Sequence, residues 1–232
     1  MEWLKHSLND IVSLFFPNLC LACGENLPPR QEMICVHCQY KLPRTGFHEH
    51  RENPFTERFW GRLPLESGAA LFHFIKGGKV QRLVHQLKYK DKADIGIRLG
   101  QWYGRLLSDS PLFHSIDTVI PVPLHPKKEH LRGYNQAAMF AKGLADTMQV
   151  NCLSQGLRRN VFTETQTRKS RLERVENVTE AFEIARPADL KGRHVLLVDD
   201  IITTGATLEA CGLKLLEVPG LKLSMATIGF AG

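Results

Sequence analysis

Residues 195–207 read VLLVDDIITTGAT, and this stretch decides the predicted fold. Four apolar residues that favour strands run directly into Asp199 and Asp200. Two adjacent carboxylates at the end of a buried strand repel each other, so a cation or hydrogen-bond donors are needed to make the pair tolerable. The stretch is therefore the first candidate for a binding site.

The turn after the acidic pair has the composition of a phosphate site. Backbone N–H groups at the start of the following helix, together with hydroxyl groups, form a receptor for phosphate. A glycine in the turn allows a positive φ or a close approach of the ligand. A sugar phosphate would satisfy both the turn and the carboxylates, because it carries an anionic group and hydroxyls. The turn consists of Thr203, Thr204, Gly205, Ala206 and Thr207.

Other classes of nucleotide site lack their motifs. The Gly78-Lys79 dipeptide has neither the upstream glycine nor the Ser/Thr of a P-loop. No G-x-G-x-x-G motif follows a predicted strand, which excludes the common dinucleotide fingerprint. The structural alternative is an exposed strand end with two solvated aspartates.

From about residue 66 onward, strand patterns alternate with helix patterns. Apolar residues at helical spacing predict helices over 80–87, 99–106, 137–144 and 208–217, and β-rich runs predict strands over 67–74, 116–122, 181–185, 194–198 and 221–230. Such alternation predicts an α/β fold with a mostly parallel sheet and helices on both faces. Ligands bind at the carboxyl ends of strands in these sheets, which directs attention to the ends of 116–122 and 194–198.

Four cysteines predict a metal site near the N-terminus. Cys20 and Cys23 form one Cys-x-x-Cys knuckle, and Cys35 and Cys38 form a second. Four thiolates are the ligand set of a tetrahedral Zn²⁺ that has no open position, so the site is expected to be structural. A disulfide pair and unrelated thiols are the alternatives. Apolar residues near helical spacing between Trp3 and Phe16 also predict a short N-terminal helix. We expect a small module over 1–60 that contains this helix and the zinc site and ends in a polar linker, and a second domain over 61–232.

Composition sets wider limits. The chain has 232 residues and a net charge of +6, which leans toward anionic partners without requiring nucleic acid. No apolar run approaches the roughly 18–20 residues of a spanning helix. Charged Glu2, Lys5 and Asp10 interrupt the N-terminal apolar residues, which argues against a signal peptide. We therefore expect a cytoplasmic protein with reduced cysteines.

Two basic stretches flank the predicted site. Residues 119–136 end a strand with prolines and then supply donors for an anion, namely His125, Lys127, Lys128 and Arg132. Residues 158–174 hold six Lys or Arg against two Glu, with weak periodicity, as expected of a mobile lid. A solvated basic face is the alternative for either stretch.

The stretch 195–207 resembles the phosphoribosyl-pyrophosphate (PRPP) motif of type I phosphoribosyltransferases. In that family the acidic pair binds the ribose 2′- and 3′-hydroxyls, and the turn binds the 5′-phosphate. The resemblance implies that Asp199 and Asp200 position the ribose in the catalytic site, and that residues 203–207 hold the phosphate.

Four motifs in order are similar to the ComF family, also called ComFC, GntX- or YhgH-like. This competence-associated family combines an N-terminal zinc ribbon with a type I phosphoribosyltransferase fold. Residues 87–90 match its Leu-Lys-Tyr element, and 121–126 with 132–136 match its pyrophosphate loop. The family's mobile-loop pattern falls on Arg159, Thr163, Gln166, Arg171 and Arg174.

The resemblance implies PRPP as ligand, Mg²⁺ bound with PRPP, and addition of a nucleophile at the anomeric carbon. Salvage enzymes for 6-oxopurines place an acidic general base three residues after the acidic pair, where this chain has Thr203, so that activity is not expected. Three hypotheses follow: a PRPP-binding protein that assists single-stranded DNA handling with the DNA-uptake machinery, a metabolic phosphoribosyltransferase for an unidentified base or amine, and a nucleic-acid-binding module with a vestigial PRPP pocket. Whether transfer occurs stays open.

Overall fold

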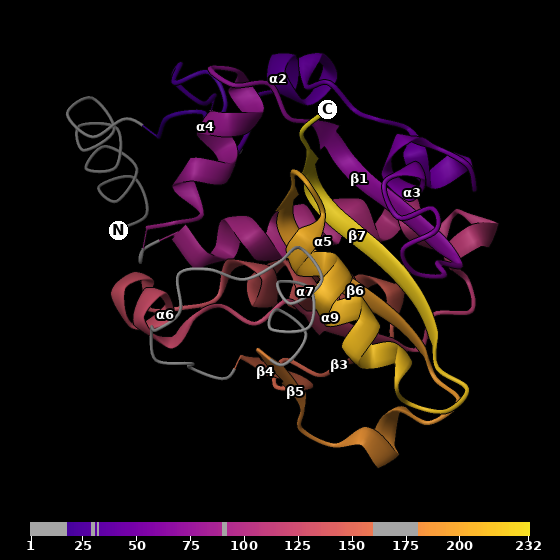
Figure 1. Ribbon diagram of the computed structural model, residues 1–232. Coiled ribbons are helices and arrows are strands. Elements are labelled where there is room, and N and C mark those ends of the chain that lie inside the picture. The colour runs from indigo at the N-terminus through magenta and orange to yellow at the C-terminus, as the bar shows by residue number, and fades with distance from the viewer. Residues whose placement is uncertain (1–17, 29–30, 32, 90–91, 160–180) are drawn as a thin grey trace, which may run out of the picture.

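The structure, a computed structural model, describes residues 18–28, 31, 33–89, 92–159 and 181–232 (Figure 1). Its main sheet has five parallel strands in the order β1-β7-β6-β2-β3. The mostly parallel sheet expected from the sequence is therefore confirmed. The strands are β1 (Ser67–His73), β2 (Thr118–Pro121), β3 (Asn151–Cys152), β6 (His194–Ile202) and β7 (Lys222–Phe230).

Helices cover both faces of this sheet, as predicted. Helix α7 (Gln136–Met148) packs on β2 and β6, and α5 (Ala93–Ser108) packs on α7. Helix α9 (Ala206–Leu216) contacts β6 and β7 and lies in front of them in Figure 1, with α5 behind the sheet. The described part of the chain contains no helix with the length and apolar character needed to cross a membrane. The other helical segments described between residues 67 and 232 are α4 (Lys79–Gln86), η3 (Pro111–Phe113), α6 (Pro126–Arg132) and η4 (Pro187–Leu190).

Glycines bring α5 and α7 into backbone contact. A Cβ atom on Gly100 would lie 2.3 Å from the carbonyl oxygen of Phe140, and one on Gly143 would lie 2.0 Å from that of Ile97. Neither position has room for a side chain, because real Cβ atoms do not approach backbone oxygens so closely. This helix pair forms the layer behind the strands that carry the acidic residues.

Two predicted strands differ from expectation. Strand β5 (Phe182–Ile184) pairs antiparallel with β4 (Leu157–Arg159) in a separate two-stranded sheet. Strand β6 does not end at Asp199 and Asp200 but continues to Ile202, because β7 supplies a partner as far as Phe230. The acidic pair therefore lies inside a hydrogen-bonded ladder.

The expected linker after the cysteine segment is packed on the sheet. Helix α2 (Val36–Lys41) carries the predicted ligand Cys38, and η1 (Phe47–Glu49) and α3 (Pro54–Glu57) follow it in the linker. Phe47, Phe55 and Phe59 are buried, and the Asn53 side-chain amide donates to the carbonyl oxygen of Gly68 at 2.9 Å. The linker interpretation is wrong for residues 47–59, since their aromatic side chains belong to the core of the sheet. The division of the chain near residue 60 stays a prediction, and the expected N-terminal helix lies outside the described residues.

A buried polar chain crosses β6, β7 and β1 beside the core. The Ser67 hydroxyl donates to the Leu112 carbonyl at 3.2 Å, so the Ser224 hydroxyl, 2.8 Å away, donates to Ser67. His194 Nε2, 2.9 Å from Ser224, is then the donor of that pair. Its Nδ1 accepts from Ser115 at 2.8 Å. Each group of the chain is satisfied when His194 is neutral with its proton on Nε2.

The pKa of His194 is lowered, chiefly by burial. Since the folded pKa lies below the unfolded value of about 6.5, the unfolded chain binds more protons below that pH. We predict that wild-type stability falls as the pH drops from about 6.5 toward the lower folded pKa. His194→Gln should reduce this pH dependence in urea unfolding, whereas the exposed control His50→Gln should leave it unchanged. Identical pH profiles for wild type and His194→Gln would contradict the assignment.

Candidate functional site

Asp199 and Asp200 are consecutive, half-buried residues of β6. The backbone N–H of Asp200 donates to Asp199 Oδ1 at 2.8 Å, and the N–H of Ile201 donates to Asp200 Oδ1 at 2.7 Å. These short bonds fix one oxygen of each carboxylate.

The environment of the pair opposes its double ionisation. Burial, reinforced by the charge of Asp200, raises the pKa of Asp199 well above its usual range. Burial also raises the pKa of Asp200, while the Ile201 N–H, Lys88 and Arg132 act in the opposite direction. A cation or hydroxyl donors brought to this point would stabilise the charged pair.

The turn from β6 to α9 holds its glycine in the positive-φ conformation expected from the sequence. Gly205 is the N-cap of α9 with φ of +81°, a left-handed conformation that favours glycine. A Cβ atom there would lie 3.1 Å from the ring of Phe59, so the buried aromatic also restricts the position. The flanking residues are exposed, and they are Thr203, Thr204, Ala206 and Thr207.

The first basic stretch forms a short helix, α6, instead of a loop. His125 caps this helix, because its Nδ1 accepts from the N–H of Lys127 at 3.2 Å. Lys127 and Lys128 are exposed, and Arg132 donates to Gln136 Oε1 at 2.5 Å. The charge of Arg132 opposes the rise in the pKa of Asp200 that burial causes.

Tyr134 fixes the turn formed by residues 87–89, and neither Tyr134 nor Lys88 is among the predicted site residues. Its hydroxyl lies 2.5 Å from the carbonyl oxygen of Leu87 and 3.0 Å from that of Tyr89, so one proton is shared between them. Lys88 lies between these two carbonyls and acts on Asp200. The Leu-Lys-Tyr element contained the signal for Lys88, but nothing in the sequence placed Tyr134 against it.

The second basic stretch is described only at its edges. Arg159 lies on β4, with its guanidinium 5.6 Å from the centroid of the Phe182 ring. Thr163, Gln166, Arg171 and Arg174 lie outside the described residues. Their role in a mobile loop stays a prediction.

The four predicted cysteine ligands converge. Their Sγ atoms all lie within 4.8 Å of one another, and Cys23 Sγ is 3.8 Å from Cys35 Sγ. A tetrahedron with Zn–S bonds of about 2.3 Å has edges of about 3.8 Å, so the spacing suits zinc. All four are free cysteines, which removes the disulfide alternative.

Backbone donors favour thiolates in this cluster. The N–H of Cys35 donates to Cys20 Sγ at 3.3 Å. Burial opposes ionisation of Cys20, but such N–H donors hold its pKa at about 6. Burial and the neighbouring thiols raise the pKa of Cys38 to about 12. A dication that neutralises all four sulfurs relieves this conflict, so the donor set fits a structural zinc ion.

Helix α4 links the cysteine cluster to the acidic pair. Arg82, on α4, donates to the carbonyl oxygen of Cys23 at 3.4 Å. Lys88 follows the same helix two residues after its end at Gln86. The two candidate sites are therefore neighbours along one short helix.

The comparisons with known proteins point to phosphoribosyl transferase domains and to competence proteins. Residues 135–230 match the family model of the phosphoribosyl transferase domain, which spans the acidic pair and the turn after it. Competence protein F of Haemophilus influenzae is 28% identical over 90% of this chain and 94% of its own length. The DNA utilization protein YhgH of Escherichia coli strain K12 is 30% identical over 58% of this chain, covering 60% of that protein. Competence protein ComFC of Bacillus subtilis is 34% identical over 43% of this chain and 38% of its own length.

Removing metal should unfold the cysteine segment alone. We predict that Cys38→Ser, or treatment with a chelator, abolishes zinc binding and exposes residues 18–42 to hydrogen exchange, because metal binding and folding are coupled in such small segments. Residues 47–59 should stay protected, since Phe47, Phe55 and Phe59 pack in the core of the sheet. Metal analysis and exchange mass spectrometry measure both effects.

Cys152→Ser is the matched control, because Cys152 is a half-buried thiol outside the cluster. It should keep full zinc content. Freshly purified wild-type protein without zinc, or equal zinc in Cys38→Ser, would overturn the metal assignment.

Proposed function

We propose that the chain binds PRPP and assists the handling of single-stranded DNA. Residues 135–230 match the family model of the phosphoribosyl transferase domain, and the similar proteins are named as competence and DNA utilization proteins. The observation that carries the PRPP part is the half-buried acidic pair beside an exposed turn at the start of α9. Within the matched domain, this arrangement offers acceptors for ribose hydroxyls next to donors for a phosphate.

Each part of the ligand has a proposed partner. Asp199 and Asp200 accept hydrogen bonds from the ribose hydroxyls, and residues 203–207 hold the 5′-phosphate. Arg132 and Lys88 act on Asp200 and would attract the pyrophosphate. His125, Lys127 and Lys128 extend the cationic surface toward α6.

Mg²⁺ bound with PRPP would supply positive charge beside the two carboxylates and the pyrophosphate. The chain's own contribution is then positional and electrostatic: it orients the ribose, neutralises charge that develops on the leaving pyrophosphate, and keeps two carboxylates ionised next to the ligand.

A transfer reaction on a base or amine is the second proposal for the same pocket. Exposed Thr203 offers a hydroxyl where a general base would be needed for 6-oxopurines, and a hydroxyl cannot serve as that base at neutral pH. Pyrophosphate release from PRPP in the presence of a panel of nucleobases and amines separates a transferase from a PRPP-binding protein.

The DNA part of the proposal rests on the relatives' names and on charge. The relatives are named as competence and DNA utilization proteins. The chain has a net charge of +6, of the sign that attracts phosphodiesters. We propose a cytoplasmic location, where PRPP and incoming single strands would both be available, with the zinc segment as a structural module.

Neutralising the acidic pair should lower the affinity for PRPP without lowering the thermal stability of the ligand-free protein. For Asp199→Asn/Asp200→Asn we predict at least a tenfold loss of PRPP affinity in calorimetry with Mg²⁺, because the acceptors lose their charge. The thermal midpoint of the ligand-free variant should be equal to or above that of wild type, since burial and repulsion are relieved. The exposed Asp189→Asn is the control. Equal PRPP affinity in all three proteins would reject the site.

Tyr134→Phe tests the positioning of Lys88. Loss of the hydroxyl shared by the Leu87 and Tyr89 carbonyls frees the turn, so PRPP affinity should fall about three- to tenfold. Zinc content should stay unchanged, and the effect should disappear in a Lys88→Ala background, where the positioned group is absent. Tyr40→Phe, at an 84% exposed tyrosine, is the control. An equal loss in the presence and absence of Lys88 would indicate a merely structural role.

A further inference from the structure

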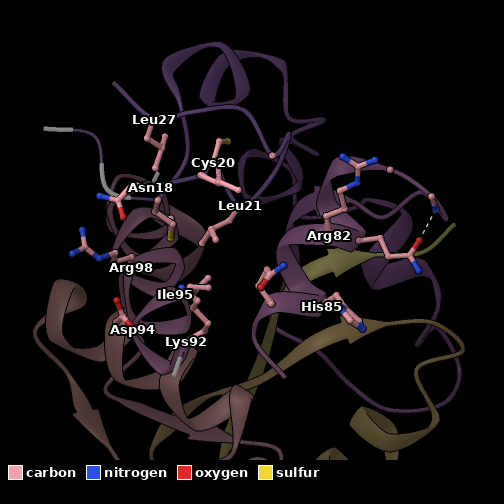
Figure 2. A pocket seen from close by; sticks show the side chains of 17 residues that line it. Asn18, Cys20, Leu21, Leu27, Arg82, His85, Lys92, Asp94, Ile95 and Arg98 are labelled. Atoms are coloured by element: carbon pink, nitrogen blue, oxygen red, sulfur yellow. Dashed lines mark hydrogen bonds between the residues drawn. The ribbon is translucent and has the colours of Figure 1, made fainter. Parts of the chain in front are cut away.

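A cavity of about 680 Å³ lies between the cysteine segment, α4 and the start of α5, apart from the acidic pair (Figure 2). Asn18, Cys20, Leu21 and Leu27 border it from the cysteine segment. Arg82 and His85 come from α4, and Asp94, Ile95 and Arg98 from α5. Its volume falls in the range of pockets that enclose small organic ligands.

Cationic side chains dominate the charge of this cavity. Arg82, Lys92 and Arg98 line it together with a single carboxylate, Asp94. Arg82, Lys92 and Asp94 are exposed, so an anion from solution can reach them. Cys20 also lines the cavity, but it belongs to the cysteine cluster on one wall. Among the remaining charged side chains, three cations against one carboxylate favour a phosphate-bearing ligand over a cationic one.

The same cavity has an apolar wall. Leu21, Leu27 and Met33 are half-buried, and Ile95 is buried below them. An aromatic pair lies at one side, because the His85 ring that lines the cavity packs edge to face on Tyr89 at 5.4 Å between centroids. Tyr89 is 53% exposed and lies beside His85, outside the residues that line the cavity.

We propose that this cavity binds an unpaired nucleotide segment of single-stranded nucleic acid. Phosphates contact the cations, and a base lies against the apolar wall and the aromatic pair. A duplex keeps its bases stacked inside and presents mainly phosphates, so it would leave the wall unused. This inference rests on the proposed DNA function and gives it a location.

The position of the cavity connects it to the PRPP site. Gln86 lines the cavity at the end of α4, and Lys88, two residues further, acts on Asp200. A strand seated along α4 therefore runs toward the acidic pair, past the turn that Tyr134 holds.

The test is fluorescence anisotropy of the full-length protein with a labelled oligothymidylate of about 20 nucleotides over a range of salt concentrations. Each phosphate contact contributes about 0.7 to the slope of log affinity against log salt for single strands. Arg82→Ala and Lys92→Ala should each weaken binding about three- to tenfold and reduce that slope by about 0.7. Arg186→Ala, at an exposed arginine near η4, is the matched control and should change neither quantity.

Zinc content and PRPP affinity are measured on the same preparations. Arg82 also bonds the Cys23 carbonyl, so if Arg82→Ala loses zinc, Lys92→Ala decides the question. Reduced oligonucleotide binding at full zinc content supports the proposal. Unchanged oligonucleotide binding in both variants overturns the assignment of this cavity as the binding site but leaves the proposed DNA function intact.

Two further outcomes would also overturn the inference. Absence of oligonucleotide binding by wild type overturns both this inference and the DNA part of the proposed function, while PRPP binding is judged separately. A duplex of the same length that competes as well as the single strand overturns the inference, because the apolar wall would then contribute nothing. Photo-crosslinks from 4-thiothymidine should map to the residues that line the cavity.

Discussion

Two adjacent carboxylates within the paired part of β6 are the constraint on which the candidate site depends. Asp199 pairs with Thr227 of β7, and the ladder continues to Ile202, so the backbone cannot swing the acidic residues into solvent. Burial raises both pKa values, and the compensation must come from groups delivered by other elements. Lys88 comes from the turn after α4, and Arg132 comes from the end of α6.

The phosphate turn depends equally on residues that carry no ligand chemistry. Phe59 lies against Gly205, and Arg62 forms an ion pair with Glu209 in the first turns of α9. Arg58 donates to the Ala231 carbonyl at 2.5 Å and lies 4.2 Å from the centroid of the Phe230 ring. The segment after the cysteines therefore packs against the turn at the start of α9 and supports it. Deletion of this segment would disturb the candidate PRPP site as well as the zinc module.

Local patterns account for what the sequence predicted correctly. Strand and helix periodicities located the helices on the faces of the parallel sheet and four of its five strands, while the two-residue β3 was too short to give a pattern. The acidic pair, the glycine turn and the paired cysteines are short motifs whose chemistry is local, so each was visible without a fold. The spacing of Gly96, Gly100 and Gly104 on α5 is a local signal for the close contact with α7.

Tertiary contacts account for the rest. The extension of β6 to Ile202 depends on the register of β7, which no property of β6 specifies. Residues 47–59 looked like a linker, because isolated aromatic residues in a polar stretch have no periodicity. The contact between Tyr134 and the Leu87 carbonyl joins residues 47 positions apart, and the basic cavity is assembled from three separate segments.

Helix α4 explains how the two candidate sites can be adjacent and still be energetically separable. Its buried residues Val80, Leu83 and Val84 anchor it in the core, and the Tyr134 hydroxyl fixes the turn at its end. The Arg82 bond to the Cys23 carbonyl is long, at 3.4 Å, and exposed, so it contributes little to the position of the helix. Loss of metal would release Arg82 without moving Lys88, because the apolar anchor and the tyrosine remain. The zinc module therefore shapes one wall of the basic cavity, while the acidic pair draws its cations from elements that the metal does not hold.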